Sequence, residues 1–114
     1  MNKISIIVPC YNEEDVLEIF YKKITEVSSE INAEFEYIFV DDGSKDKTLE
    51  ILRKHNKEDS RVRYISLSRN FGKEGAMYAG LEAATGDYVA IMDADLQDPP
   101  ELLKEMYETL LTDE

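Results

Sequence analysis

Apolar residues gather in four short runs, separated by longer stretches in which apolar residues recur every three or four positions. The runs span 4–8, 37–40, 62–67 and 88–92 and are rich in β-branched and aromatic residues, which is typical of strands. The first, second and fourth runs are nearly continuous in apolar residues, which predicts strands covered on both faces. The third run alternates, as a half-buried or edge strand does.

Helical periodicity follows the first and second runs. Asn12 is a residue type that caps helices, and Glu13, Glu14 and Asp15 suit the positive end of a helix dipole, so a first helix is expected to begin here. A second helix is expected to begin near 44–46. The apolar stripe of the first helix is predicted to comprise Val16, Phe20, Ile24, Val27 and Ile31.

Two further helices follow the third and fourth runs. The third is expected from about Gly72 to Ala84, with Gly86 as the glycine that ends it. The fourth is expected to have Asp98 as its cap and the prolines 99–100 in its first turn. Its apolar face is predicted to comprise Leu102, Leu103, Met106, Leu110 and Leu111. Strands that alternate with helices indicate an α/β fold, with a mainly parallel sheet of about four strands flanked by helices.

Polar residues cluster directly after each apolar run. The clusters span 9–14, 41–44, 68–73 and 93–98. In an open parallel sheet, ligands bind outside the carboxyl ends of the strands, so all four clusters are expected at one edge of the sheet. Several carboxylates gathered at that edge predict a ligand site.

Asp93 and Asp95 follow the fourth run two positions apart and can aim at one point if the chain turns there. Their oxygens suit Mg²⁺ or Mn²⁺, and Mg²⁺ is usually held by one or two carboxylates plus substrate phosphates. Such an ion would offset the repulsion between a phosphate ligand and a chain whose net charge is −12. The alternative is that Asp95 or Asp98 caps the next helix and Asp93 is a solvated turn residue.

Two further pairs in these clusters suit a nucleotide. Asp41 and Asp42 could accept hydrogen bonds from a ribose hydroxyl or a base N–H, or could form only a turn before Gly43. Arg69 and Lys73 could contact a diphosphate, helped by free backbone N–H groups at a helix start. Equally, these two cations could balance nearby acids on the surface.

Three single residues have competing interpretations. Tyr11 could stack on a base or form the edge of the core. Cys10, the one cysteine, excludes an internal disulfide and is expected to be a small buried residue rather than a nucleophile. His55 lies in a polar stretch and is expected to be a surface residue without a role.

Composition and missing motifs argue against several classes of protein. The acidic charge argues against nucleic acid as a partner. No stretch reaches the roughly 18 apolar residues of a membrane-spanning helix, and no signal peptide is visible. We expect a cytoplasmic location, at the cytoplasmic face of a membrane if the full-length protein is membrane-associated. The chain contains neither a P-loop nor a G-x-G-x-x-G motif.

Three other classes of protein are alternative interpretations. A receiver-like signalling domain would need an acidic pair after the first strand, whereas the acids here follow the second and fourth runs. A sugar-nucleotide nucleotidyltransferase usually opens with a glycine-rich phosphate loop, which the segment 9–12 is not. A non-catalytic nucleotide-binding module stays open.

Four segments, in their order along the chain, resemble family 2 glycosyltransferases. They are 6–14 (IIVPCYNEE), 40–44 (VDDGS), 69–73 (RNFGK) and 92–100 (MDADLQDPP). Within that family the chain is most similar to the polyprenyl-phosphate sugar transferases, which act on dolichyl or undecaprenyl phosphate. The similarity covers nearly the whole chain.

The resemblance implies a Rossmann-like GT-A fold and a nucleotide-diphosphate-sugar donor, either a UDP-sugar or a GDP-sugar. It places Pro9, Tyr11 and Glu13 in the nucleotide pocket. It also implies that Asp42 recognises the base, with Asp41 near it.

The resemblance further implies that Asp93 lies near the ribose and Asp95 ligates the metal that bridges the diphosphate. Gln97 would face the sugar or the acceptor. The metal would neutralise the leaving nucleoside diphosphate.

The same resemblance implies that residues 1–114 are the nucleotide-sugar-binding N-terminal part of a catalytic domain, and that this domain is truncated here. The acceptor half and the general base would lie in the missing part, so no catalytic residue is named and little or no transfer is expected from this chain alone. A polyprenyl phosphate is the expected acceptor. A truncated sheet could expose an apolar edge, which would favour a homo-oligomer.

Overall fold

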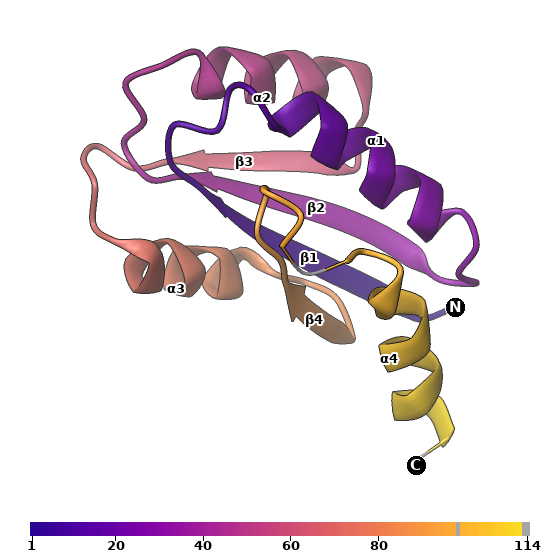
Figure 1. Cartoon of the computed structure of the whole chain (residues 1–114). Helices are drawn as coiled ribbons and strands as arrows, with labels where there is room; N and C mark the ends of the chain where they lie inside the picture. The colour runs from indigo at the N-terminus through magenta and orange to yellow at the C-terminus, as the bar shows by residue number, and fades with distance from the viewer. Residues whose placement is uncertain (98, 113–114) are drawn as a thin grey trace.

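The computed structural model describes residues 1–97 and 99–112, in which four strands alternate with four helices. The elements are β1 (Lys3–Cys10), α1 (Leu17–Ser28), β2 (Glu34–Asp41), α2 (Thr48–Glu58), β3 (Val62–Ser66), α3 (Lys73–Ala83), β4 (Tyr88–Ile91) and α4 (Leu102–Thr112). The strands form one parallel sheet in the order β3–β2–β1–β4 (Figure 1). The predicted α/β fold with a parallel sheet is confirmed.

Helices cover both faces of the central strands β1 and β2. On one face, residues of α1, α2 and α4 share a core with alternate residues of the two strands. This core includes Phe20 of α1 and Tyr37 and Phe39 of β2. On the other face α3 packs on Ile38 and Val40 (Figure 1). Burial on both sides explains why these two strands read as continuous apolar runs.

The expectation that the fourth run is covered on both faces is wrong. Within the described residues β4 pairs only with β1, so it forms an edge of the sheet. Val89 and Ile91 are 43% and 38% exposed. Together with Leu81, Leu102 and Met106 they line an apolar groove beside this edge. An apolar run carries no information about which of its faces is covered.

The fourth helix buries less of its predicted apolar face than expected. It is anchored by Leu103 and Tyr107, whose ring meets that of Tyr88 edge to face at 5.5 Å. The rest of the predicted apolar face is exposed: Leu102, Met106, Leu110 and Leu111. Its predicted cap, Asp98, lies outside the described residues. No helix in the described part of the chain has the length and apolar character needed to cross a membrane.

The first helix begins later than predicted, and Asn12 does not cap it. Asn12 has a left-handed backbone (φ 51) and its Oδ1 accepts a hydrogen bond from the backbone N–H of Lys45. The side chain is therefore committed to the neighbouring loop. The cap position of α1 is Val16, which makes no side-chain cap bond. The helix ends at Ser28, so Ile31 lies beyond it although it is buried.

Two other predicted helix boundaries need correction. The second helix begins at Thr48, whose N–H donates to Asp46 Oδ1 at 2.9 Å. Gly86 is not the left-handed end of α3, since the residue after the helix, Ala84, is already extended. Gly86 is needed for close approach instead: a Cβ there would lie 2.6 Å from Ser5 Oγ.

His55 is not a surface residue, contrary to the prediction. It is 6% exposed on α2, and its ring lies 4.2 Å from that of Tyr21. Its Nε2 lies 3.2 Å from a carboxylate oxygen of Glu18. The ring therefore fills the contact between α1 and α2, which a polar local sequence does not reveal.

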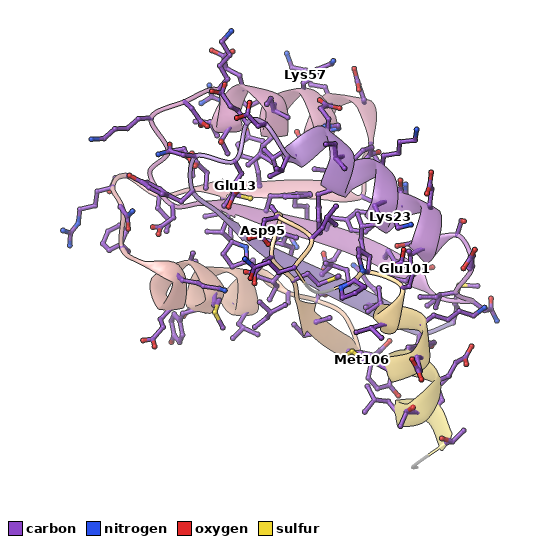
Figure 2. All side chains as sticks on the ribbon, in the orientation of Figure 1. Glu13, Lys23, Lys57, Asp95, Glu101 and Met106 are labelled. Carbon is purple, nitrogen blue, oxygen red and sulfur yellow. The ribbon has the colours of Figure 1, made fainter. Side chains whose placement is uncertain are left out.

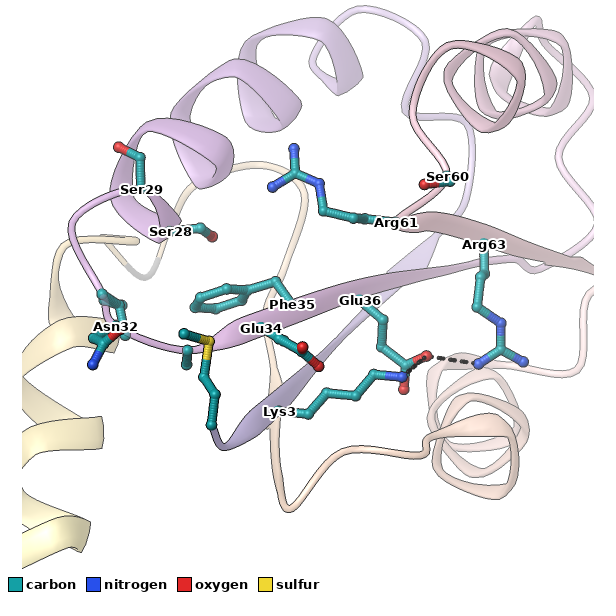
Figure 3. A pocket seen from close by; sticks show the side chains of 13 residues that line it. Lys3, Ser28, Ser29, Asn32, Glu34, Phe35, Glu36, Ser60, Arg61 and Arg63 are labelled. Carbon is teal, nitrogen blue, oxygen red and sulfur yellow. Dashed lines mark hydrogen bonds and ion pairs between the residues drawn. The ribbon is translucent and has the colours of Figure 1, made fainter.

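A hollow of about 660 Å³ lies at the amino ends of β1 and β2 (Figure 3). Glu36 reaches into it from β2, with its Oε1 2.8 Å from Arg63 Nη1 and 3.7 Å from Lys3 Nζ. The three side chains link β1, β2 and β3 at the end of the sheet opposite to the predicted site.

Candidate functional site

The loops after all four strands meet at the carboxyl edge of the sheet and enclose a cleft of about 370 Å³. The cleft is lined by Pro9, Cys10, Tyr11, Glu13, Asp42, Asn70, Gly72, Lys73, Asp93, Asp95 and Gln97. Each loop contributes at least one polar or charged side chain. The predicted gathering of the polar clusters at one edge is confirmed.

Of the predicted site residues, all but Asp41 and Arg69 line this cleft. Asp41 is 2% exposed, and its Oδ1 accepts the N–H of Ser44 at 3.1 Å, so it fixes the turn after β2. The guanidinium of Arg69 lies over the ring of Phe71, 4.4 Å from the ring centre.

Three lining residues were not predicted as site residues: Cys10, Asn70 and Gly72. Asn70 and Gly72 stand in the third polar cluster but carry no charge that would have singled them out. Cys10 is 1% exposed. Burial, followed by the nearby charges of Glu13 and Asp41, raises the pKa of its thiol well above the usual value, which suits a structural residue.

The loops after β1 and β2 are tied together by side chain–backbone hydrogen bonds. The N–H of Asn12 donates to Ser44 Oγ, and the N–H of Lys45 donates back to Asn12 Oδ1, both at 2.9 Å. The N–H of Glu13 donates to Thr48 Oγ1 at 2.9 Å. These bonds hold one wall of the cleft in a defined shape before any ligand arrives.

The loop after β3 is held against that wall by Asp42 and Gly43. The carboxylate of Asp42 accepts the N–H groups of Phe71 and Gly72 at 2.7 and 3.0 Å. Gly43 has φ 73, and a Cβ on it would lie 2.6 Å from backbone atoms of the loop after β3. Only glycine permits both the backbone conformation and the contact.

The acidic part of the cleft comprises Glu13, Asp93 and Asp95, and the first and last of these lie close together in Figure 2. Burial, and then the charges of Asp95, Asp93 and Asp46, raise the pKa of Glu13 above its ordinary value of 4.5. Lys73 is the one basic side chain among the described residues of the lining, and its Nζ lies 2.7 Å from Asp93 Oδ1. The site is therefore acidic and only partly neutralised.

The donor set fits a divalent cation that is shared with a ligand. Asp93 and Asp95 offer hard carboxylate oxygens on one short loop that faces the cleft. In the described part of the chain no group of three or more His, Cys, Asp or Glu side chains is arranged to hold a metal. One or two carboxylates completed by substrate phosphates is the usual arrangement for Mg²⁺.

Residues 5–114 match the family described as glycosyl transferase family 2. YkcC of Bacillus subtilis (strain 168), described as an uncharacterized glycosyltransferase, is 50% identical over 104 residues, which are 91% of this chain and 32% of that protein. The prophage bactoprenol glucosyl transferase homolog of Escherichia coli (strain K12) is 45% identical over 106 residues, 93% of this chain and 35% of that protein. The chain thus spans about one third of the length of these curated relatives.

Two solved structures share the fold. Glucosyl-3-phosphoglycerate synthase from Mycobacterium tuberculosis, in complex with Mn²⁺, UDP and glucosyl-3-phosphoglycerate, matches with a TM-score of 0.73 at 28% identity, over 97% of this chain and 40% of that one. A mannosyltransferase from Pyrobaculum calidifontis, in complex with GDP-Man and Mn²⁺, matches with a TM-score of 0.68 at 26% identity, over 86% and 33%.

Proposed function

We infer that this chain, which belongs to glycosyl transferase family 2, binds a nucleotide-diphosphate sugar and a divalent metal ion. Residues 1–114 would form the N-terminal, donor-binding part of a glycosyltransferase catalytic domain. The observation that carries this proposal is the convergence of all four strand-end loops on one cleft whose lining includes Asp93 and Asp95. Solved relatives that hold Mn²⁺ with UDP or GDP-Man support it.

We assign the base to the end of the cleft formed by Pro9, Tyr11 and Asp42. Tyr11 is 42% exposed, so its ring is accessible for stacking. Asp42 is oriented by two backbone N–H groups, and its carboxylate oxygens retain lone pairs that can accept a base N–H. A preoriented acceptor loses little freedom on binding.

We assign the diphosphate to the acidic end, with Asp95 as a metal ligand and Asp93 as a second ligand or a partner of the ribose. Mg²⁺ or Mn²⁺ bound there would supply the positive charge that stabilises a leaving nucleoside diphosphate. Lys73 would contact the diphosphate, and Gln97 would face the sugar or the acceptor. Arg69, which lies over Phe71 outside the lining, would assist only through its charge.

The bactoprenol glucosyl transferase homolog among the relatives supports a polyprenyl phosphate as the acceptor of the whole protein. With such an acceptor, the whole protein would act at the cytoplasmic face of a membrane. We assign no general base within this chain, so we expect it to bind donor with little or no transfer of its own. The exposed apolar groove beside β4 supports a homo-oligomer of this chain in isolation.

Isothermal titration of the chain with UDP and with GDP, each with and without Mn²⁺, tests the proposal. We expect one nucleotide to bind only with Mn²⁺, and Asp95→Ala to abolish that binding. Asp15→Ala removes an exposed carboxylate outside the cleft lining and serves as the matched control. A folded wild-type chain that binds neither nucleotide, or an Asp95→Ala variant that binds as well as the control, contradicts the assignment.

A further inference from the structure

Lys73 and Asp93 form an ion pair across the cleft. Lys73 is the first residue of α3, Asp93 lies in the loop after β4, and both line the cleft. The Nζ–Oδ1 distance is 2.7 Å, and the two side chains are 59% and 29% exposed. The carboxylate that the proposed function places beside the metal is therefore already occupied by an ammonium group.

An anion bound beside the amino end of α3 would be a second possible partner for the ammonium group of Lys73. The backbone of Lys73 stands at the amino end of α3, where the helix dipole favours an anion. A diphosphate there would offer the ammonium charged oxygens, to which charge-assisted hydrogen bonds are strong. The long lysine side chain can reach either partner without movement of the backbone.

We propose that Lys73 competes with the divalent metal ion for Asp93, so that metal and diphosphate enter the cleft together and neither binds well alone. This inference rests on the proposed function and adds the order of binding to it. Without a nucleotide, the ammonium both occupies an oxygen of Asp93 and repels a cation at Asp95. When a diphosphate arrives, Lys73 transfers to its phosphate oxygens, and Asp93 becomes available to the metal or the ribose.

The competition has a signature that a purely structural role lacks, because its two effects have opposite signs. Lys73→Gln should bind Mn²⁺ alone roughly three- to tenfold more tightly, since a repelling charge and a rival for Asp93 are removed. The same variant should bind the nucleotide several-fold more weakly at saturating Mn²⁺, since a phosphate contact is lost. Lys73→Arg, which keeps the charge, should resemble the wild type in both titrations.

The experiment begins with a Mn²⁺ titration of the whole chain, in which the electron paramagnetic resonance signal reports the concentration of free Mn²⁺. A UDP or GDP titration at saturating Mn²⁺ comes second. Lys57→Gln makes the same charge change on α2, far from Asp95 in Figure 2, and should alter neither affinity. In an Asp93→Asn background, Lys73→Gln should give a much smaller gain in Mn²⁺ affinity, because the contested oxygen is no longer anionic.

Unchanged or weaker Mn²⁺ binding by Lys73→Gln overturns the competition, even if nucleotide binding is as proposed. An equal gain in the Lys57→Gln variant also overturns it, because the effect would then reflect net charge alone. A wild-type chain that binds Mn²⁺ but neither nucleotide overturns the proposed function itself, and with it the order of binding. The two failures are therefore distinguishable.

Discussion

Replacing Glu36 with Gln is expected to lower the free energy of unfolding by about 3 kcal/mol at neutral pH. Glu36 lies in β2 and is 4% exposed, yet it is ionised. Its Oε2 accepts hydrogen bonds from Ser5 Oγ at 2.6 Å and from the Thr85 N–H at 2.7 Å. Its Oε1 accepts a hydrogen bond from Arg63 Nη1 at 2.8 Å (Figure 3).

The magnitude follows from the pKa of this carboxyl group. Burial alone would raise it, but the hydrogen bonds from Ser5, Thr85 and Arg63 outweigh burial and lower the pKa of Glu36 from 4.5 to about 2. The pKa difference between the unfolded and folded states, about 2.5, corresponds to roughly 3 kcal/mol. Domains of this kind have total stabilities of about 5–15 kcal/mol, so the loss should be readily measured.

The sign of the pH dependence is fixed by the lowered pKa. Because the folded value lies below the unfolded one, the contribution is complete above about pH 4.5 and is lost as the pH falls towards 2. The stability difference between the wild type and Glu36→Gln should be constant from about pH 6 to 8 and fall by about half or more by pH 3.

Urea unfolding followed by circular dichroism at pH 7, 5 and 3 measures this difference. Glu34→Gln makes the same change at an exposed position of β2 and should shift the stability by less than about 0.5 kcal/mol. The reasoning is refuted if Glu36→Gln costs under about 1 kcal/mol at pH 7, or if its cost is as large at pH 3 as at pH 7.

Three further results are expected. Gly43→Ala should cost about 1–3 kcal/mol in urea unfolding and more than Gly72→Ala, because both have positive φ but only a Cβ on Gly43 meets backbone atoms; equal costs would exclude the contact as the cause. Cys10 should react with a thiol reagent far more slowly in the native state than in urea, since burial raises its pKa; a fast native reaction would contradict this placement. Hydrogen bonds from Arg61, chiefly, and from the Tyr21 O–H at 2.6 Å lower the pKa of Asp59 to about 2, so Tyr21→Phe should raise this pKa in part, as measured by an NMR titration; an unchanged value would show that the Tyr21 bond is not formed.

The strands were predictable from the sequence because β-branched and aromatic residues gather in short runs, and the structure shows a strand in each predicted place. The starts of the first two helices were not, because they depend on side chains that bond across loops. Asn12 is a good cap by residue type, but its amide accepts a hydrogen bond from Lys45, which is remote in the sequence. The burial of His55 against Tyr21 likewise depends on the packing of α1 on α2.

The location of the site was predictable because parallel strands bring their carboxyl ends to one edge. The separate structural roles of neighbouring residues were not predictable. Asp41 and Asp42 are adjacent and identical in type, yet Asp41 is used by the turn while Asp42 lines the cleft. Which of two successive residues faces the cleft depends on the path of the chain after β2, which local composition does not encode.

Two glutamates show how the fold separates structural carboxylates from those available to a ligand. Glu36 and Glu13 lie at opposite ends of the sheet, and burial by itself would raise the pKa of each. At Glu36 the protein supplies enough hydrogen-bond donors to reverse that effect, so the charge of this carboxylate is stabilised within the protein. At Glu13 the neighbouring charges are those of Asp95 and Asp93, which raise the pKa of Glu13 further. Among the described residues of the lining, Lys73 alone offers a positive charge against these carboxylates, and this imbalance is the physical reason for proposing a divalent cation that enters with a diphosphate.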